Sequence, residues 1–189
     1  MTVEAVTTQL ESLVGNQYKW DPGAVRGSLH YWLTTTGEEA KVPDMVAGGM
    51  QCFGLPVRVA YNLGALSYAQ ASEMYSGFIG TCFAKSPPTS FCPDGVTQAY
   101  WTKTSCIPCF SKAGTGSFPR GSAVFFSTKQ IAYSAHFAVA TGEGTNMVSF
   151  GHGAGLLAAS LAVGIRDMED LQDAYGGLFT ACHYGTPAW

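Results

Sequence analysis

The chain has 189 residues, of which 47% are hydrophobic and 12% charged, and its formal net charge is −3. This length and hydrophobicity fit a single folded domain over residues 1–189 and exclude a disordered chain. The sequence has no run of Lys or Arg, so we expect no nucleic-acid partner. Its most apolar segment, residues 151–165, is too short and glycine-rich to span a bilayer, so we expect no membrane partner.

The N-terminal part of the chain is expected to be helical. Apolar residues recur at helical spacing over residues 2–14, and a short helix is expected over residues 25–34. A third helix follows Cys52 and ends at Gly64, since glycine is a common helix-ending residue. Residues 67–78 again show helical spacing.

The character of the sequence changes between residues 80 and 118. Four prolines, scattered Ser and Thr, and four of the six cysteines fall in this stretch. We interpret it as an irregular, cysteine-rich insertion on one side of the domain. Ordered structure is expected to resume with strands over residues 122–127, 135–141 and 147–150, then a helix or buried strand over 156–163, a helix over 167–175, and an edge strand over 178–183. This pattern indicates an α+β fold, with N-terminal helices packed on an antiparallel sheet.

Cys52 is the candidate nucleophile. It follows a glycine pair in the segment Gly-Gly-Met-Gln-Cys-Phe-Gly-Leu, residues 48–55, immediately before the expected helix. Unpaired backbone N–H groups and the positive end of the helix dipole favour a thiolate at such a position. A buried, inert cysteine is the alternative interpretation, because free cysteine is among the most buried residue types.

His136 is the candidate general base, because a cysteine nucleophile needs a nearby proton acceptor. Alternation on its strand puts His136 on one face with the small residues Ala138 and Ala140. A third residue on the next strand would hold the imidazole ring. An odd-numbered hairpin loop selects His152 and an even-numbered loop selects Ser149, because a one-residue slip exchanges the faces of a strand. We favour the odd loop and His152, and retain Ser149 as the alternative.

Three motifs in this order resemble the NlpC-type branch of the papain-like cysteine hydrolases. They are Cys-x-Gly-Leu at a helix start, Arg-Gly-Ser-Ala-Val-Phe-Phe, and Ala-His-Phe-Ala-Val-Ala-Thr-Gly-Glu-Gly. The resemblance implies a papain-like fold with Cys52 as nucleophile, His136 as base and a polar third residue on the following strand. It covers residues 49–64 and 119–152. The family's Asp before the cysteine is Gln51 here, and its following Ser is Phe53.

The remaining cysteines have three interpretations, and structural disulfides are favoured over free thiols or one structural zinc ion. The zinc interpretation would use the four cysteines of the insertion, but their spacing lacks a second CxxC, so we expect no metal and no cofactor. His30 and His183 are expected to be packed or surface residues. The five remaining cysteines are Cys82, Cys92, Cys106, Cys109 and Cys182.

Cysteine density favours an oxidising compartment, yet residues 1–14 contain acidic residues and no basic region before an apolar stretch. We therefore expect a protein made in the cytoplasm without a signal peptide and exported by a dedicated secretion system. The type VI secretion amidase effectors, which the chain resembles at the level of fold, act in the periplasm of a target cell. That resemblance implies an antibacterial effector with a cognate inhibitor (immunity) protein.

Three functions follow as hypotheses. The first is a peptidoglycan stem-peptide amidase or endopeptidase, as the resemblance implies. The second is a cysteine protease or deamidase toxin that acts on a protein target. The third is a non-enzymatic, disulfide-stapled binding module in which Cys52 is a core residue.

Overall fold

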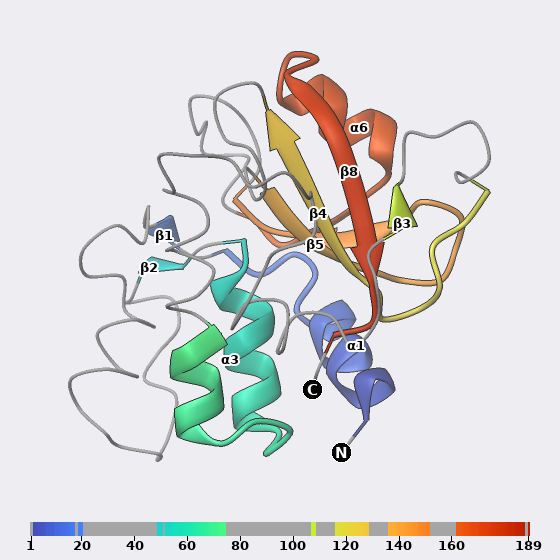
Figure 1. The fold of residues 1–189 in the computed structure, drawn as a ribbon. Coiled ribbons are helices and arrows are strands. Elements are labelled where there is room, and N and C mark those ends of the chain that lie inside the picture. Colours follow the sequence, from blue (N-terminus) through green and yellow to red (C-terminus); the bar gives the residue numbers. More distant parts are fainter. Residues whose placement is uncertain are drawn as a thin grey trace.

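In the computed structural model, the described residues are 2–17, 19–20, 49–50, 52–74, 107–108, 116–128, 136–151, 162–187 and 189. They form helices and a six-stranded sheet whose neighbouring strands are all antiparallel (Figure 1). The α+β class expected from the sequence is confirmed. The expected helix over residues 25–34 and most of the insertion lie outside the described residues.

Two helices from the N-terminal part pack on one face of the sheet. Helix α1 spans Val3–Ser12 and begins at Thr2, whose hydroxyl accepts a hydrogen bond from the Ala5 amide. Helix α3 spans Gly54–Asn62, and its residues from Gly54 to Tyr61 are all buried. Residues 68–74 form a further helix, with Ala71 and Met74 in the same core. The helices predicted after residue 2, after Cys52 and from residue 67 are thus confirmed over the described residues.

The sheet has the strand order β3-β8-β4-β5-β6-β7. Its strands are β3 (Ile107–Pro108), β4 (Ala123–Thr128), β5 (His136–Ala140), β6 (Met147–Ser149), β7 (Gly164–Arg166) and β8 (Phe179–Gly185). Helix α6 (Met168–Ala174) lies between β7 and β8 in the chain, with the Asp167 side chain as its N-cap. A separate two-stranded parallel sheet joins β1 (Lys19–Trp20) to β2 (Gly49–Met50).

The position of β8 corrects one expectation. The sequence suggested an edge strand, but β8 pairs with β4 over six residue pairs and with β3 on its other side. A chain segment from the end of the protein therefore lies inside the sheet, and the edge beside it is filled by β3 from residues predicted to be irregular. Pairing of such distant segments leaves no periodic signal in either strand.

Alternation along the central strands divides the core into two clusters. One cluster joins Phe125, Phe137 and Val139 to α1 and α3, and the other joins Phe126 and Ala138 to Leu171 of α6 and to Phe179. Figure 1 shows α6 and α3 in separate regions of the molecule with the sheet between them. Every residue of β5 is buried, so neither face of this strand is available to solvent. No helix among the described residues is long and apolar enough to cross a membrane.

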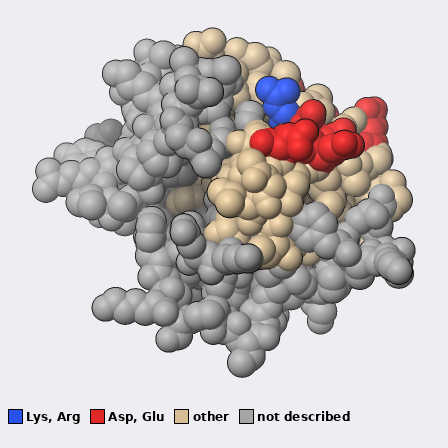
Figure 2. Space-filling model, turned by 90° about the horizontal axis from the view of Figure 1, so that it is seen from above, with Lys and Arg blue, Asp and Glu red and all other residues tan. Residues whose placement is uncertain are grey.

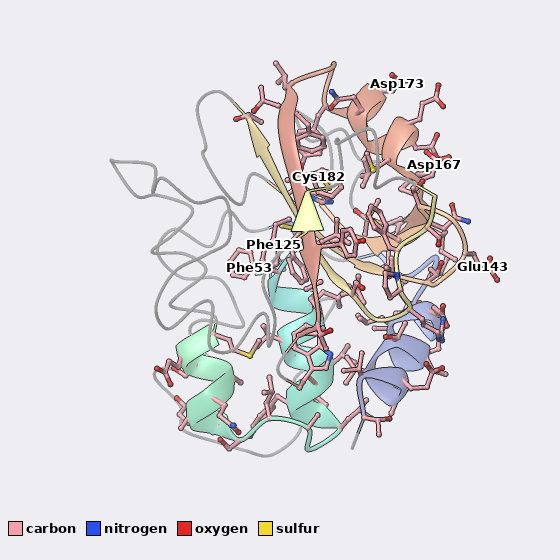
Figure 3. All side chains as sticks on the ribbon, turned by 45° about the vertical axis from the view of Figure 1, so that its right-hand side comes forward. Phe53, Phe125, Glu143, Asp167, Asp173 and Cys182 are labelled. Carbon is pink, nitrogen blue, oxygen red and sulfur yellow. The ribbon has the colours of Figure 1, made fainter. Side chains whose placement is uncertain are left out.

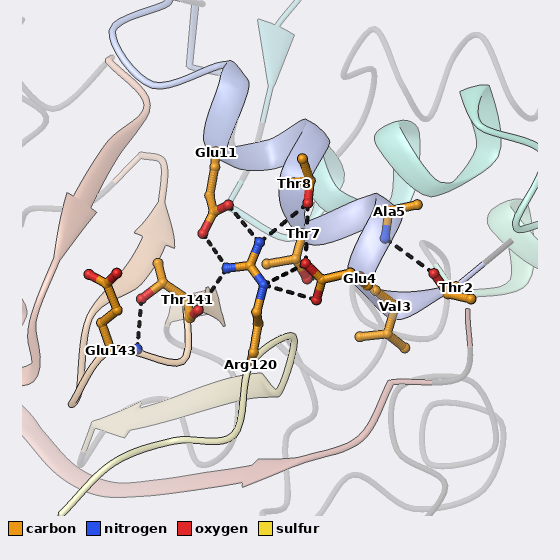
Figure 4. A network of polar contacts seen from close by, with 10 residues as sticks. All are labelled: Thr2, Val3, Glu4, Ala5, Thr7, Thr8, Glu11, Arg120, Thr141 and Glu143. Atoms are coloured by element: carbon orange, nitrogen blue, oxygen red, sulfur yellow. Dashed lines mark hydrogen bonds and ion pairs between the residues drawn. The ribbon is translucent and has the colours of Figure 1, made fainter.

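Arg120 joins α1 to the β5–β6 hairpin (Figure 4). Its Nε contacts both carboxylate oxygens of Glu4, at 2.8 and 2.9 Å, while its terminal nitrogens make a two-point contact with Glu11. It also donates to the Thr141 carbonyl at 2.7 Å and to the Thr8 hydroxyl at 3.3 Å. The planar guanidinium presents fixed donors that suit such a multiple contact.

Two glycines allow Arg120 and α1 to approach the sheet. Gly121 has φ +77°, and a Cβ at this position would overlap Cγ1 of Val3. Gly142 has φ +90°, and its Cβ would lie 2.8 Å from Arg120 Cβ. Both positions therefore need a residue without a side chain, for conformation and for space.

We predict that Gly121→Ala destabilises the protein by about 2 kcal/mol or more, because the left-handed conformation costs roughly 1–2 kcal/mol for alanine and Val3 must also move. Gly144→Ala is the matched control: Gly144 also has a positive φ, of +55°, but nothing lies within 4 Å of its Cβ position. Urea unfolding of the two variants measures the difference. Equal destabilisation would show that the contact with Val3 contributes nothing.

The Glu11 contact predicts a pH dependence. The hydrogen bond from Arg120 lowers the pKa of Glu11 from its ordinary value of 4.5, although burial opposes this shift. Because the folded-state pKa is the lower one, the stabilisation is fully present well above pH 4.5 and is lost as the pH falls through the folded-state pKa. Glu11→Gln should therefore reduce stability at pH 7 by up to about 1 kcal/mol, the range for partly exposed ion pairs. Thermal unfolding from pH 7 to pH 3 should show the two proteins converging.

Candidate functional site

Cys52 lies directly ahead of α3, as predicted from the sequence. Strand β2 ends at Met50, and α3 begins at Gly54 with Phe53 as its N-cap. The cysteine carries a thiol, is partly exposed, and packs against the core cluster on the α3 face of the sheet. Phenylalanine at the N-cap offers no side-chain acceptor to the first-turn amides. The local geometry therefore favours negative charge near this end of the helix.

His136 lies at the start of β5 and is fully buried. Its Nε2 lies 2.7 Å from Ser149 Oγ, and its Nδ1 lies 3.0 Å from the Tyr175 hydroxyl. Phe126 and Phe179 face the ring at centroid distances of 6.1 and 6.5 Å. The histidine is thus a polar group inside an aromatic cluster, with a hydroxyl at each ring nitrogen.

The structure does not bring Cys52 and His136 to the same face of the sheet. Figure 3 shows Phe53, the neighbour of Cys52, beside Phe125, and both belong to the cluster on the α3 face. His136 pairs with Phe126 and shares its face, which is the face covered by α6. Each residue lies on the local element that the sequence predicts, but the alternation of β5 sends His136 away from α3.

The hairpin register shows which of the two candidate partners shares the face of His136, and the odd loop favoured from the sequence is wrong. Strand β5 pairs Ala138 with Ser149 and Ala140 with Met147, so the connection has an even number of residues and Ser149 shares the face of His136. The Thr141 amide donates to the Asn146 carbonyl at 2.9 Å, which extends the ladder and leaves a four-residue loop. His152, the favoured alternative, lies outside the described residues.

Glycine conformation explains this register. Gly142 and Gly144 both have positive φ, of +90° and +55°, and the loop is closed by a hydrogen bond from the Asn146 amide to the Glu143 carbonyl. The Thr141 hydroxyl also accepts from the Glu143 amide at 3.2 Å. The loop thus uses its glycines inside a four-residue turn, a length that the sequence pattern did not distinguish from three or five.

Tyr175 is a site residue that the sequence analysis missed. It is the C-cap of α6, 39 residues from His136, and its ring packs against Phe179 at a centroid distance of 4.4 Å. Neither its spacing from His136 nor its neighbours marks it as a polar partner. Its role depends on where α6 docks, which local sequence does not specify.

The Ser149 and Tyr175 hydroxyls can satisfy the ring in any protonation state. A neutral imidazole has one N–H and one lone pair, and each hydroxyl can donate or accept, so both tautomers are matched. An imidazolium would donate to both oxygens. His136 and the two hydroxyls therefore have the atoms needed to hold or pass a proton. In this arrangement both ring nitrogens of His136 are already hydrogen-bonded.

Of the other cysteines and histidines, Cys182 is the one whose side chain the structure describes. Cys182 is buried on β8 and disulfide-bonded, which agrees with the interpretation favoured from the sequence for this residue, and the other half of that bond lies outside the described residues. His30 and most of the insertion also lie outside them, as does the side chain of His183. Among the described residues, no group of three or more His, Cys, Asp or Glu side chains could hold a metal ion.

The surface over α6 is acidic. The helix carries Glu169, Asp170 and Asp173, all exposed, and has no basic residue in its last turn. Figure 2 shows Asp and Glu residues gathered together beside one basic residue in the view from above, and Figure 3 places Asp167, Asp173 and Glu143 on one side of the molecule. This described surface would repel nucleic-acid phosphates.

No protein-family model, no curated protein and no solved structure matches the chain.

We predict that Ser149→Ala destabilises the protein by about 1–3 kcal/mol, because the variant removes the hydroxyl that Nε2 of the buried His136 ring contacts. Ser122→Ala is the matched control, since Ser122 is also buried but lies outside this group. Urea unfolding measures both changes. A Ser149 variant as stable as the control would show that the contact with His136 adds no stability.

Proposed function

We propose that the chain is a cysteine-dependent amide hydrolase with Cys52 as its nucleophile. The observation that carries the proposal is the position of this thiol, partly exposed and directly ahead of α3. The first-turn amides and the helix dipole favour a thiolate there. The segment from β2 through α3 also carries the Cys-x-Gly-Leu motif that resembles the NlpC-type hydrolases.

The proposed reaction is acyl transfer. The Cys52 thiolate attacks an amide carbonyl, the C–N bond breaks as the amine leaves with a proton, and water hydrolyses the resulting thioester. The Cys52 amide is a candidate donor to the oxyanion. His136 is the proposed proton carrier, held by Ser149. That role requires the ring to leave one of its two hydroxyl partners and to reach the α3 face, so it is separable from thiolate formation at α3.

Peptidoglycan stem peptides are the first proposed substrate, on the basis of the family resemblance. The same resemblance supports delivery by a dedicated secretion system into a target-cell periplasm and a cognate inhibitor protein in the producer. A protease or deamidase toxin that acts on a protein would use the same chemistry. Hydrolysis of purified cell walls, followed by detection of new amino groups, separates the two targets.

A second candidate function is a disulfide-stapled binding module without catalysis. The specific observation in its favour is that His136 is fully buried, hydrogen-bonded at both nitrogens and separated by the sheet from Cys52. In that case the histidine group stabilises the packing of α6 on the sheet, and Cys52 is a partly exposed core residue.

Alkylation of Cys52 by iodoacetamide tests these candidates. We predict that Cys52 retains more of its pH 9 labelling rate at pH 6 than an ordinary thiol does, because only the thiolate reacts. Cysteine peptides are followed separately by mass spectrometry. His136→Gln measures whether the reactivity depends on the histidine or on α3 alone.

Three outcomes distinguish the candidates. Low-pH reactivity lost in His136→Gln supports the full Cys–His pair. Reactivity that survives in this variant supports thiolate formation at α3 and removes His136 as the base. Labelling like that of an ordinary thiol, together with full biological effect of Cys52→Ala, would exclude the hydrolase and leave the binding module.

A further inference from the structure

We infer that Tyr175 is a latch that keeps His136 bound and covered on the α6 face of the sheet. Release of Tyr175 would uncover the ring on the α6 face of the sheet, opposite Cys52, so the inference goes beyond the proposed function and does not depend on it. The feature itself, a hydroxyl from a surface helix bonded to a fully buried imidazole, is independent of that function.

The two hydroxyls that hold the ring come from elements of different stability. Ser149 is 2% exposed and belongs to β6, which is paired with β5 on one side and β7 on the other. To withdraw Ser149, the ladder between β5 and β6 would have to break. The Ser149 contact is therefore the more firmly held one, since withdrawing it requires a strand paired on both sides to open.

Tyr175 lies outside the sheet, in a turn that Gln172 of α6 ties to the Phe179 backbone through two hydrogen bonds of 3.1 Å. Helix α6 has seven residues, and Leu171 is its buried residue. Tyr175 is partly exposed and is followed by Gly176 and Gly177, both with positive φ and with nothing within 4 Å of their Cβ positions. The turn after Tyr175 therefore has open space beside its two glycines. Short, exposed elements of this kind open locally at a small fraction of the global free energy.

The aromatic rings show what the latch covers. Tyr175 lies against both His136 and Phe179, at centroid distances of 5.4 and 4.4 Å, and Phe179 stacks on Phe126 at 4.7 Å. Phe179 and Phe126 belong to β8 and β4, inside the sheet. When Tyr175 withdraws, these two rings stay in place, Nδ1 loses the tyrosine hydroxyl, and the ring is exposed from the α6 side.

Four described residues contact the His136 ring, two through hydroxyl groups and two through aromatic rings. They are Phe126 from β4, Ser149 from β6, Tyr175 from α6 and Phe179 from β8. These contacts hold the ring through two hydroxyl hydrogen bonds and through packing. Only one of those hydroxyls, that of Tyr175, comes from outside the sheet.

Carbethoxylation by diethyl pyrocarbonate tests the latch, because this reagent acylates an imidazole nitrogen that carries a lone pair. Tyr175→Phe keeps the ring stack but removes the hydroxyl. We expect labelling of His136, followed on its own peptide, to rise about fivefold in this variant, the change expected when one hydrogen bond between neutral groups is lost. Tyr184→Phe is the matched control, since Tyr184 lies on β8 with its ring against Phe118, outside the described ring and hydrogen-bond contacts of His136.

Low concentrations of urea separate local opening from global unfolding. Labelling through the latch should be nearly independent of urea, whereas labelling through global unfolding rises steeply with it. Unchanged His136 labelling in Tyr175→Phe would overturn the inference. So would an equal or larger rise in Ser149→Ala at the same low urea, because the two contacts would then open alike.

The same samples report on the proposed function separately. If the latch is correct, His136 labelling rises in Tyr175→Phe while alkylation of Cys52 at pH 6 keeps its rate, because the ring opens on the face opposite Cys52. If only the latch is correct, His136 labelling rises while Cys52 reacts as an ordinary thiol. Failure of the hydrolase therefore leaves the Tyr175 result intact, and failure of the latch leaves the Cys52 result intact.

Discussion

Strand β5 is buried on both of its faces, and the alternation of its side chains determines how the rest of the molecule is arranged. Phe137 and Val139 face α1 and α3, while His136, Ala138 and Ala140 face α6. Phe125 meets Phe137 edge-on at a centroid distance of 5.1 Å and anchors the first face. Because one strand supplies both cores, a one-residue slip of its register would move every β5 side chain to the opposite core.

Two groups of polar side chains join the helices to the sheet, one beside each core. Arg120 fixes α1 against the hairpin at one end of the sheet, through contacts that are partly exposed. His136, Ser149 and Tyr175 join β5, β6 and α6 inside the other core. The Arg120 contacts are partly exposed ion pairs, so the stability that they give the fold is modest and depends on pH. The second group holds a fully buried imidazole, where loss of the buried Ser149 hydroxyl is costly because water cannot replace it.

This arrangement bears directly on the proposed chemistry. The thiol of Cys52 belongs to the α3 core and the imidazole of His136 to the α6 core, so their cooperation depends on a change at the start of β5. Thiolate formation at α3 needs no such change. The two halves of the proposed mechanism therefore rest on different features of the fold.

The sequence by itself determined the local elements and the residues they carry. Helical spacing located α1, α3 and α6, and apolar composition located β4, β5 and β6, because each of these signals lies within a few residues. It also identified Cys52 at a helix start. It placed His136 on a strand and left two candidates for its partner after the hairpin turn, Ser149 and His152. Tertiary structure alone decided the rest. The glycines of a four-residue loop selected Ser149 through the register, the docking of α6 brought Tyr175 to the ring, and the pairing of β8 between β3 and β4 built the interior of the sheet. These outcomes depend on contacts between segments far apart in the chain, for which local periodicity contains no signal.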